Sequence, residues 1–304
     1  MLTTGKKLLD KASRSGYAVG AFNINNMEIL QAVIRAAEKL KSPVILQTSE
    51  GAIRYAGLEM LFTMLRTAAE RSPVPCAIHL DHGRDLDVIK RCIKIGYTSV
   101  MYDGSHLSFH KNITMTKRVV KLAHRKGISV EAELGTIGGA EDAINAREII
   151  LTDPNAAQTF IDQTGCDSLA VAIGTSHGAY KFLGAGTLDI QRLDAIRSRV
   201  PVPLVLHGAS GVPHSLIQKA RHYGAHLGTP EGVPDNQIRR AIAHGIAKIN
   251  TDTDIRLAFT AAIRQQLSTK RHLFDPRDVL APARDLMQRV VEHRIKLFGS
   301  AGKA

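Results

Sequence analysis

Eight short apolar segments recur along the chain, and stretches with helical periodicity separate them. In chain order they are residues 18–22, 44–47, 76–80, 99–102, 129–133, 168–173, 204–206 and 246–249. Each is short and apolar enough for a buried strand. Between the first two, Leu30, Ile34 and Ala37 fall on one face of a predicted helix. Strands that alternate with helices form parallel sheets.

Eight such units with nearly continuous apolar strands predict a closed α/β architecture, a (β/α)8 TIM barrel, formed by residues 1–304 as a single domain. The alternative is an open doubly wound sheet. That fold would need a glycine-rich dinucleotide loop after the first strand, and the sequence GAFNINN is not one. We expect a short amphipathic helix at the N-terminus and an extra C-terminal helix at 281–297, packed on the barrel or on a partner subunit.

Two long connections interrupt this pattern, at residues 135–155 and 223–235. Long loops in a compact domain often carry function. We therefore expect both connections to lie near a binding or catalytic site.

The composition limits the classes of partner. The formal charge is +12, but Lys and Arg are scattered, aromatic residues make up 5% and Trp is absent. Platforms for base stacking are therefore scarce, so we expect no nucleic-acid partner and favour phosphorylated substrates. No apolar run approaches the ~20 residues of a membrane span, and the N-terminus lacks the apolar core of a secretory signal. We expect a cytoplasmic protein with no membrane partner. Three widely spaced cysteines argue against a disulfide framework.

Three histidines follow apolar segments closely. His82 follows the third segment, His177 the sixth and His207 the seventh. In a barrel the functional groups lie at the C-terminal ends of the strands. Three imidazoles that leave a fourth position open are typical of catalytic zinc, and the adjacent Asp81 is a ready proton carrier. The parity of His79 with Asp81 would point it inward as well.

The other strand ends are also polar. The residues at these positions are Asn23, Ser49, Asp103, Glu133 and Asn250. Two glycine-rich segments, 174–178 and 207–211, combine Gly with hydroxyl groups, and exposed N–H groups in such loops bind phosphate. Residues 251–254 follow the last strand and open a helix at 254–267. A phosphate site and an N-cap are both open interpretations of this turn.

At these residues the chain resembles the class II, metal-dependent fructose-bisphosphate aldolases, in the shorter branch that includes tagatose-bisphosphate aldolases. The resemblance runs from YAVGAFN at 17–23 to FGSAG at 298–302. Two long motifs carry it: IHLDHG at 78–83, and VEAELG at 130–135 leading to GGAE at 138–141.

The resemblance implies a role for each candidate residue. The catalytic zinc would be bound by His82, His177 and His207. A second, buried divalent metal, present in some members, would be bound by Asp103 and Glu133. The dihydroxyacetone phosphate half would be bound by Gly178, Lys181, Gly208, Ala209, Ser210, Thr251, Asp252 and Thr253. The other half would be bound by Asn23, Ser49, Arg256 and, across a dimer interface, Arg277. A monovalent cation, Na+ or K+, would lie near Gly178, Gly208 and Ser210.

The implied reaction is reversible cleavage of fructose 1,6-bisphosphate to dihydroxyacetone phosphate and glyceraldehyde 3-phosphate, a step of glycolysis and gluconeogenesis, by a homodimer or homotetramer. Asp81 would exchange the proton of the C4 hydroxyl, with Asn250 near the enediolate. Glu141 would move the C3 proton after its loop closes. Tagatose 1,6-bisphosphate is the alternative substrate, and Asp252 and Arg256 favour fructose.

The residues alone leave three other activities open. A Schiff-base aldolase would use Lys248 in the last strand, but this leaves the histidines unexplained. A zinc hydrolase would use the same histidines with a water, although paired phosphate loops suit a bisphosphate better. A metal-bound polyanion-binding protein would show salt-sensitive affinity for nucleic acid and no turnover.

Overall fold

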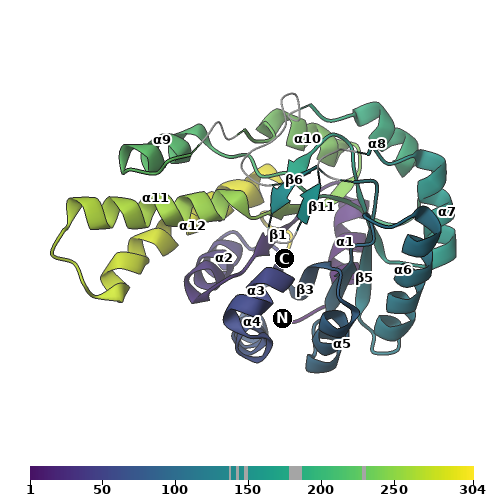
Figure 1. The fold of residues 1–304 in the computed structure, drawn as a ribbon, viewed down its shortest axis with the longest axis horizontal. Coiled ribbons are helices and arrows are strands. Elements are labelled where there is room, and N and C mark those ends of the chain that lie inside the picture. The colour runs from purple at the N-terminus through teal and green to yellow at the C-terminus, as the bar shows by residue number, and fades with distance from the viewer. Residues whose placement is uncertain (137, 142–143, 147–149, 178–186, 228–230) are drawn as a thin grey trace.

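The computed structural model describes residues 1–304 except 137, 142–143, 147–149, 178–186 and 228–230 (Figure 1). Eight parallel strands close into a barrel in the order β1-β11-β10-β8-β5-β4-β3-β2. They are β1 (Val19–Asn23), β2 (Val44–Ser49), β3 (Cys76–Gly83), β4 (Ser99–Tyr102), β5 (Ser129–Leu134), β8 (Ser168–Val171), β10 (Leu204–Leu206) and β11 (Ile246–Thr251). Every predicted apolar segment supplies one strand, so the (β/α)8 barrel is confirmed and the open sheet was wrong.

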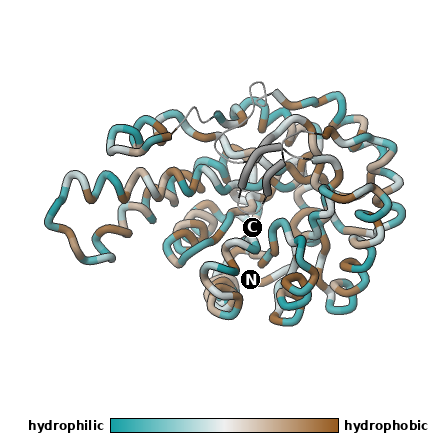
Figure 2. The backbone as a smooth tube through the Cα atoms, in the orientation of Figure 1, coloured by the Kyte–Doolittle hydropathy of each residue, from teal (hydrophilic) through white to brown (hydrophobic). Residues whose placement is uncertain are grey.

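Helices surround the barrel, and Figure 2 shows hydrophobic and hydrophilic positions alternating along them. They are α1 (Gly5–Ser15), α2 (Met27–Lys39), α3 (Glu50–Ala56), α4 (Leu58–Arg71), α5 (Leu86–Ile95), α6 (Phe109–His124), α7 (Pro154–Thr164), α8 (Ile190–Arg197), α9 (His214–His222), α10 (Asp235–Ala243), α11 (Thr253–Thr269) and α12 (Pro276–Leu297). Their apolar faces and the outward side chains of the strands form the main core. Among the described residues, no helix is both long and apolar enough to cross a membrane.

The interior of the barrel is apolar near the N-terminal ends of the strands. The predicted amphipathic helix at the N-terminus, α1, closes that end. The buried cluster consists of Leu8, Leu9, Ala12, Tyr17, Val19, Ala21, Ile45, Ala77, Ala170, Val205 and Ala247. Successive inward positions lie two residues apart along a strand. Asn23 and Gln47 therefore follow Ala21 and Ile45 toward the mouth, and the register pairs them. Because these inward positions hold polar residues, the interior of the barrel is polar near the C-terminal ends of the strands.

The first long connection contains strands that the sequence did not predict. β6 (Gly138–Glu141) pairs antiparallel with β7 (Ile144–Ala146) and parallel with β9 (Ser176–His177). The expected loop at 135–155 is therefore in part a small sheet. The predicted end of the sixth barrel strand is also corrected, because β8 ends at Val171 and His177 belongs to β9.

The C-terminal helix α12 begins five residues before its predicted start. Asp275 caps it by accepting a hydrogen bond from the backbone of Arg277, and Pro276 occupies its first position, where a missing N–H costs nothing. α12 packs against α11 and α2. Figure 1 shows α11 and α12 running side by side away from the barrel, with the turn between them at the far left.

Candidate active site

The C-terminal end of β3 turns two neighbouring side chains toward the same place. In a regular strand Asp81 and His82 would point to opposite faces. The φ of His82 is 47°, in the left-handed region, and the register between β3 and β4 shifts between Leu80 and Gly83. Ligand atoms of Asp81, His82 and His207 consequently lie within 4.8 Å of one another. The structure thus brings the predicted base beside two of the predicted zinc ligands.

His82 and His207 direct nitrogen atoms at each other. His82 Nε2 and His207 Nδ1 are 2.9 Å apart, and the rings meet edge-on with centroids 4.6 Å apart. A metal ion that binds nitrogen at about 2.0–2.1 Å can bridge two such converging lone pairs. The third predicted ligand, His177, is placed by its backbone in β9, and its side chain lies outside the described part of the chain.

Two carboxylates approach the other side of His82. His82 Nδ1 lies 3.2 Å from Asp103 Oδ2 and 3.8 Å from Glu133 Oε2. Glu133 Oε2 is buried, and no donor among the described residues bonds to it. A buried carboxylate oxygen without a donor is costly unless a cation balances it. The donor set of His82, Asp103 and Glu133 therefore fits a divalent metal ion.

The close approach of His82, Asp103 and Glu133 shifts the pKa values of all three groups. Burial lowers the pKa of His82, but Asp81, Asp103 and Glu133 outweigh burial and raise that pKa to about 10. Burial and, secondarily, the Asp103 carboxylate raise the pKa of Glu133 to about 8. The pKa of Asp103 itself lies well below its usual range, because His82 and Arg84 outweigh its burial. The cluster of His82 with these carboxylates therefore favours the binding of a cation.

Glu131 orients His207, and it is not among the predicted site residues. Its Oε1 lies 2.8 Å from His207 Nε2, and its Oε2 accepts a hydrogen bond from Lys248 Nζ at 2.7 Å. A carboxylate on the far nitrogen holds the imidazole so that Nδ1 keeps its lone pair for a metal. Strand parity is the signal for Glu131, because it stands two positions before Glu133 and faces inward.

Lys248 cannot serve as the free amine of a Schiff-base aldolase in this arrangement. Its ammonium group is fully buried and forms an ion pair with Glu131. Lys248 Nζ also lies 3.3 Å from His79 Nε2, while His79 Nδ1 lies 2.8 Å from Ser99 Oγ. His79 therefore faces inward, as its parity predicted.

Three amide groups hold the Asp81 carboxylate in place. Asn23 Nδ2 donates to Oδ2 at 2.9 Å and Asn250 Nδ2 donates to Oδ1 at 3.0 Å. Gln47 Nε2 donates to Asn23 Oδ1 at 2.6 Å and lies 3.3 Å from Asp81 Oδ2. Sequence reasoning named Asn23 and Asn250 but missed Gln47, which parity places inward two positions before Ser49.

Two of the three predicted phosphate segments, 207–211 and 251–254, lie together. The backbone N–H of Asp252 donates to Ser210 Oγ at 3.4 Å, and Gly208 has a φ of 60°. Arg256 pairs with Asp252 through Nε at 2.8 Å and Nη2 at 2.6 Å. The remaining predicted residues of these segments are buried beside them: Ala209, Thr251 and Thr253. The loop after β10 and the first turn of α11 thus form one surface.

The other predicted substrate ligands are placed differently. The Ser49 hydroxyl accepts a hydrogen bond from the backbone of Ala52 and caps α3. Arg277 has a side chain that is 88% exposed and pairs with Asp275 at the start of α12, at the far end of the α11–α12 pair. Glu141 is placed only by its backbone in β6. Gly178 and Lys181 lie outside the described residues.

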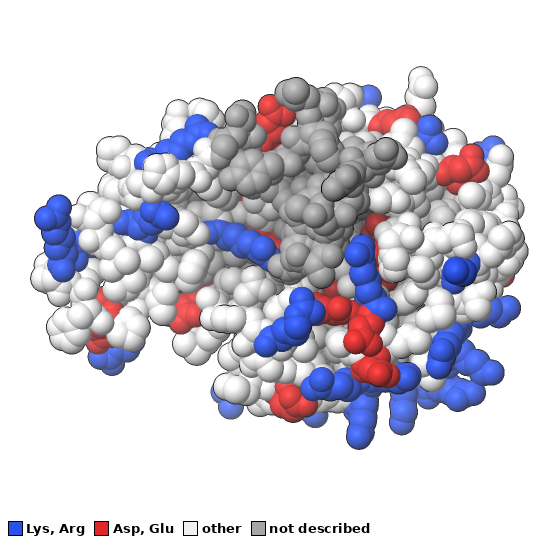
Figure 3. Space-filling model, in the orientation of Figure 1, with Lys and Arg blue, Asp and Glu red and all other residues white. Residues whose placement is uncertain are grey.

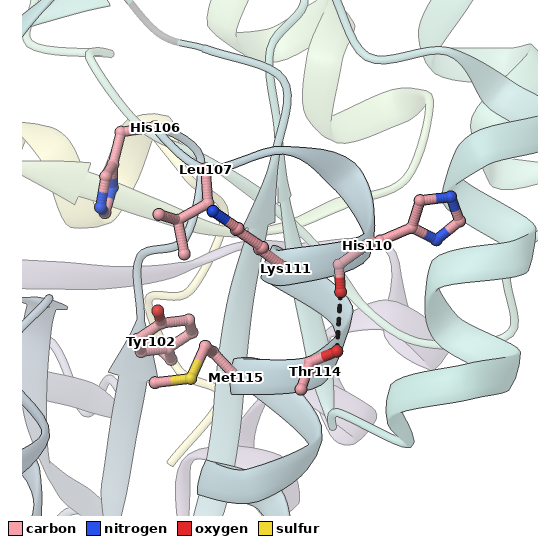
Figure 4. A pocket seen from close by; sticks show the side chains of 7 residues that line it. All are labelled: Tyr102, His106, Leu107, His110, Lys111, Thr114 and Met115. Atoms are coloured by element: carbon pink, nitrogen blue, oxygen red, sulfur yellow. Dashed lines mark hydrogen bonds between the residues drawn. The ribbon is translucent and has the colours of Figure 1, made fainter.

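A separate pocket of about 470 Å³ lies beside α6. In Figure 4, His106 and His110 stand on opposite sides of this pocket, so their rings do not converge on one point. Figure 3 shows Lys and Arg on several parts of one face, with acidic side chains among them.

Comparisons with known proteins agree with this architecture. The sequence model of the family described as "Fructose-bisphosphate aldolase class-II" matches residues 3–303. Fructose-bisphosphate aldolases from Thermus caldophilus and Helicobacter pylori are 50% and 44% identical over 306 residues, covering 100% of this chain and of each relative. The crystal structure of the YdjI aldolase from Escherichia coli K12 is 34% identical, with a TM-score of 0.82 over 100% of both chains. The chain belongs to the class II fructose-bisphosphate aldolase family.

Proposed function

We propose that this chain cleaves fructose 1,6-bisphosphate reversibly to dihydroxyacetone phosphate and glyceraldehyde 3-phosphate. One observation carries the proposal: at the barrel mouth, the Asp81 carboxylate lies beside the converging nitrogens of His82 and His207. The full-length relatives bear the name of this activity. The hydrolase and polyanion-binding alternatives have no such support.

His82, His177 and His207 would hold the zinc on which this family depends. When bound, the metal supplies Lewis-acid stabilisation of the charge that develops on the substrate, an effect worth several kcal/mol. Glu131 would keep the His207 ring in the binding orientation through the 2.8 Å contact to Nε2.

Asp81 would accept the proton of the C4 hydroxyl during cleavage and return it during condensation. The amides of Asn23 and Asn250 aim its two oxygens, so the base is oriented before substrate arrives. Glu141 would exchange the C3 proton from β6. β6 pairs with β9, so the residue proposed for proton transfer and the proposed zinc ligand His177 stand on neighbouring strands.

The phosphate groups would bind at the glycine-rich loops. Ser210, Asp252 and Thr253 lie where the loop after β10 meets the N-terminus of α11, a usual place for phosphate in barrels. With them we assign Gly178, Lys181, Gly208, Ala209 and Thr251. The second phosphate would bind near Ser49 and Arg256, and Arg277 would act from a neighbouring subunit of a homodimer or homotetramer.

Two further ions belong to the proposal. Asp103 and Glu133 would hold a second, buried divalent metal, because the Glu133 Oε2 atom lacks a donor among the described residues. A monovalent cation, Na+ or K+, would bind near Gly208 and Ser210, beside the phosphate.

The cleavage rate of purified protein on fructose 1,6-bisphosphate, before and after EDTA and with zinc restored, tests the reaction. Loss and recovery of activity is the expected result. Tagatose 1,6-bisphosphate in the same assay ranks the two substrates. Activity that resists EDTA would remove the metal from the mechanism. Inactivity on both sugars with zinc present would overturn the proposed function.

A further inference from the structure

A buried arginine on the C-terminal helix reaches the back of the phosphate segments. Arg294 of α12 is 1% exposed, and Asp254 in the first turn of α11 is fully buried. Arg294 donates to Asp254 Oδ2 through Nε at 2.8 Å and Nη2 at 2.5 Å. A buried charge of this kind is costly to form, and the proposed chemistry does not use it.

Asp254 connects Arg294 to the loop after β10. Its Oδ1 accepts a hydrogen bond from the Val212 N–H at 2.7 Å, and its Oδ2 accepts one from the Gly211 N–H at 3.2 Å. Val212 has a φ of 47°, a conformation that disfavours a β-branched residue. The loop therefore keeps this shape only while the surrounding contacts hold it.

Arg294 also sets how closely the loop can approach. A Cβ atom on Gly211 would lie 2.0 Å from Arg294 Nη2, so only glycine fits at this position with the arginine in place. Arg294 Nη1 lies 3.4 Å from Asp235 Oδ1 at the start of α10. One guanidinium thus joins α10, α11, α12 and the loop.

We propose that Arg294 is a positioning residue for the phosphate-binding loop. Through Asp254 it holds residues 208–212 and the first turn of α11 in the arrangement that receives the phosphate of the dihydroxyacetone phosphate half. This inference rests on the proposed function of that loop. The affinity for the phosphorylated substrate then depends on a helix that makes no contact with the reacting atoms.

The test compares Arg294→Lys and Arg294→Met with the wild type in the condensation direction. Lysine keeps the charge but loses the paired contacts, and methionine leaves Asp254 buried without its partner. We expect the KM for dihydroxyacetone phosphate and the inhibition constant of inorganic phosphate to rise about tenfold or more in the methionine variant and less in the lysine variant. The kcat and the zinc affinity should change much less.

Glu292→Gln is the matched control. Glu292 lies on the same helix, two residues away, and pairs with Lys39 of α2 at 2.8 Å rather than with the loop. Its loss should lower the melting temperature and leave KM unchanged. If Arg294→Met and Arg294→Lys both lower the melting temperature but both keep KM within twofold, Arg294 only stabilises the fold and the inference is wrong.

Two further variants keep the test decisive. Gly211→Ala disturbs the same contact from the loop side, and its effect on KM should be smaller in the Arg294→Lys background, since lysine lacks the clashing Nη2 atom. Strictly additive effects would contradict the inference. Ser210→Ala tests the proposed function itself: if it leaves KM unchanged, the loop is not the phosphate site, whereas a raised KM with normal Arg294 variants overturns only the role of Arg294.

Discussion

At the scale of single residues, the site depends on an interruption of regular strand geometry. Asp81 and His82 are adjacent, yet both face the mouth of the barrel because His82 adopts a left-handed conformation. For a residue other than glycine this conformation costs about 1–2 kcal/mol. The surrounding sheet holds His82 in this conformation, which fixes the distance between the proposed base Asp81 and the proposed metal ligand His82.

Asp81→Asn should lower kcat by about 10²–10⁴-fold, because the amide keeps the shape of the side chain but cannot accept the C4 hydroxyl proton. KM should change little. Steady-state cleavage of fructose 1,6-bisphosphate measures both constants. Zinc content is the control, and a variant that loses its zinc would show that Asp81 serves metal binding rather than proton transfer.

Zinc binding should release protons at pH 7. The pKa values of about 10 for His82 and about 8 for Glu133 mean that both groups carry a proton at this pH before zinc arrives. Zinc needs unprotonated His82, and its positive charge should also lower the pKa of the neighbouring Glu133, so the apparent zinc affinity should rise as pH increases through 8 toward 10. Calorimetric titration in buffers of different ionisation enthalpy counts the protons.

The same titration of Glu133→Gln provides the comparison. This variant removes one of the two groups, so the number of protons released should fall by about one. Equal proton release from both proteins would mean that Glu133 does not titrate on metal binding.

At the scale of elements, the small sheet of β6, β7 and β9 depends on Gly135, the residue directly after β5. Its φ is 88°, and a Cβ atom there would lie 2.6 Å from the carbonyl oxygen of Ile150. Gly127 has a φ of 68°, and a Cβ atom there would have no neighbour within 4 Å. A substitution at Gly127 therefore strains the backbone without adding a steric clash.

Gly135→Ala should therefore destabilise the protein by about 1–3 kcal/mol more than Gly127→Ala, because only the first adds a steric clash to the strained backbone. It should also lower kcat, since β6 carries Glu141. Denaturant unfolding and steady-state assays measure the two effects. Equal losses of stability in both variants would mean that the region around Ile150 accommodates the added methyl group.

At the scale of the whole molecule, the α11–α12 pair extends away from the barrel and carries Arg277 at its far end (Figure 1). In its own subunit this residue is remote from the barrel mouth. The proposed role of Arg277 therefore requires a second copy of the chain.

Mixed oligomers test that requirement. Arg277→Ala and Asp81→Asn subunits are each expected to be inactive, but in a mixed dimer one site combines an intact Asp81 with an intact Arg277 from its neighbour. Refolding the two variants together should restore about a quarter of wild-type activity. No recovery on mixing would place the action of Arg277 within its own subunit.

The sequence by itself determined the barrel and the family. Hydrophobic periodicity is a local property, so all eight strands, α1 and the C-terminal helix could be predicted from it. Strand ends and motifs likewise located Asp81, His82 and His207. Only the tertiary structure decided which side chains meet: Gln47 beside Asp81, Glu131 beside His207, and Arg294 beside Asp254, behind the loop after β10. Strand parity indicates that Gln47 and Glu131 face inward, but these contacts join residues distant in the chain, and local patterns do not determine which inward side chains meet. The sheet of β6, β7 and β9 was missed for the same reason, because β6 is glycine-rich, β7 has only three residues, and both are defined by pairing, β7 with β6 and β6 with β9.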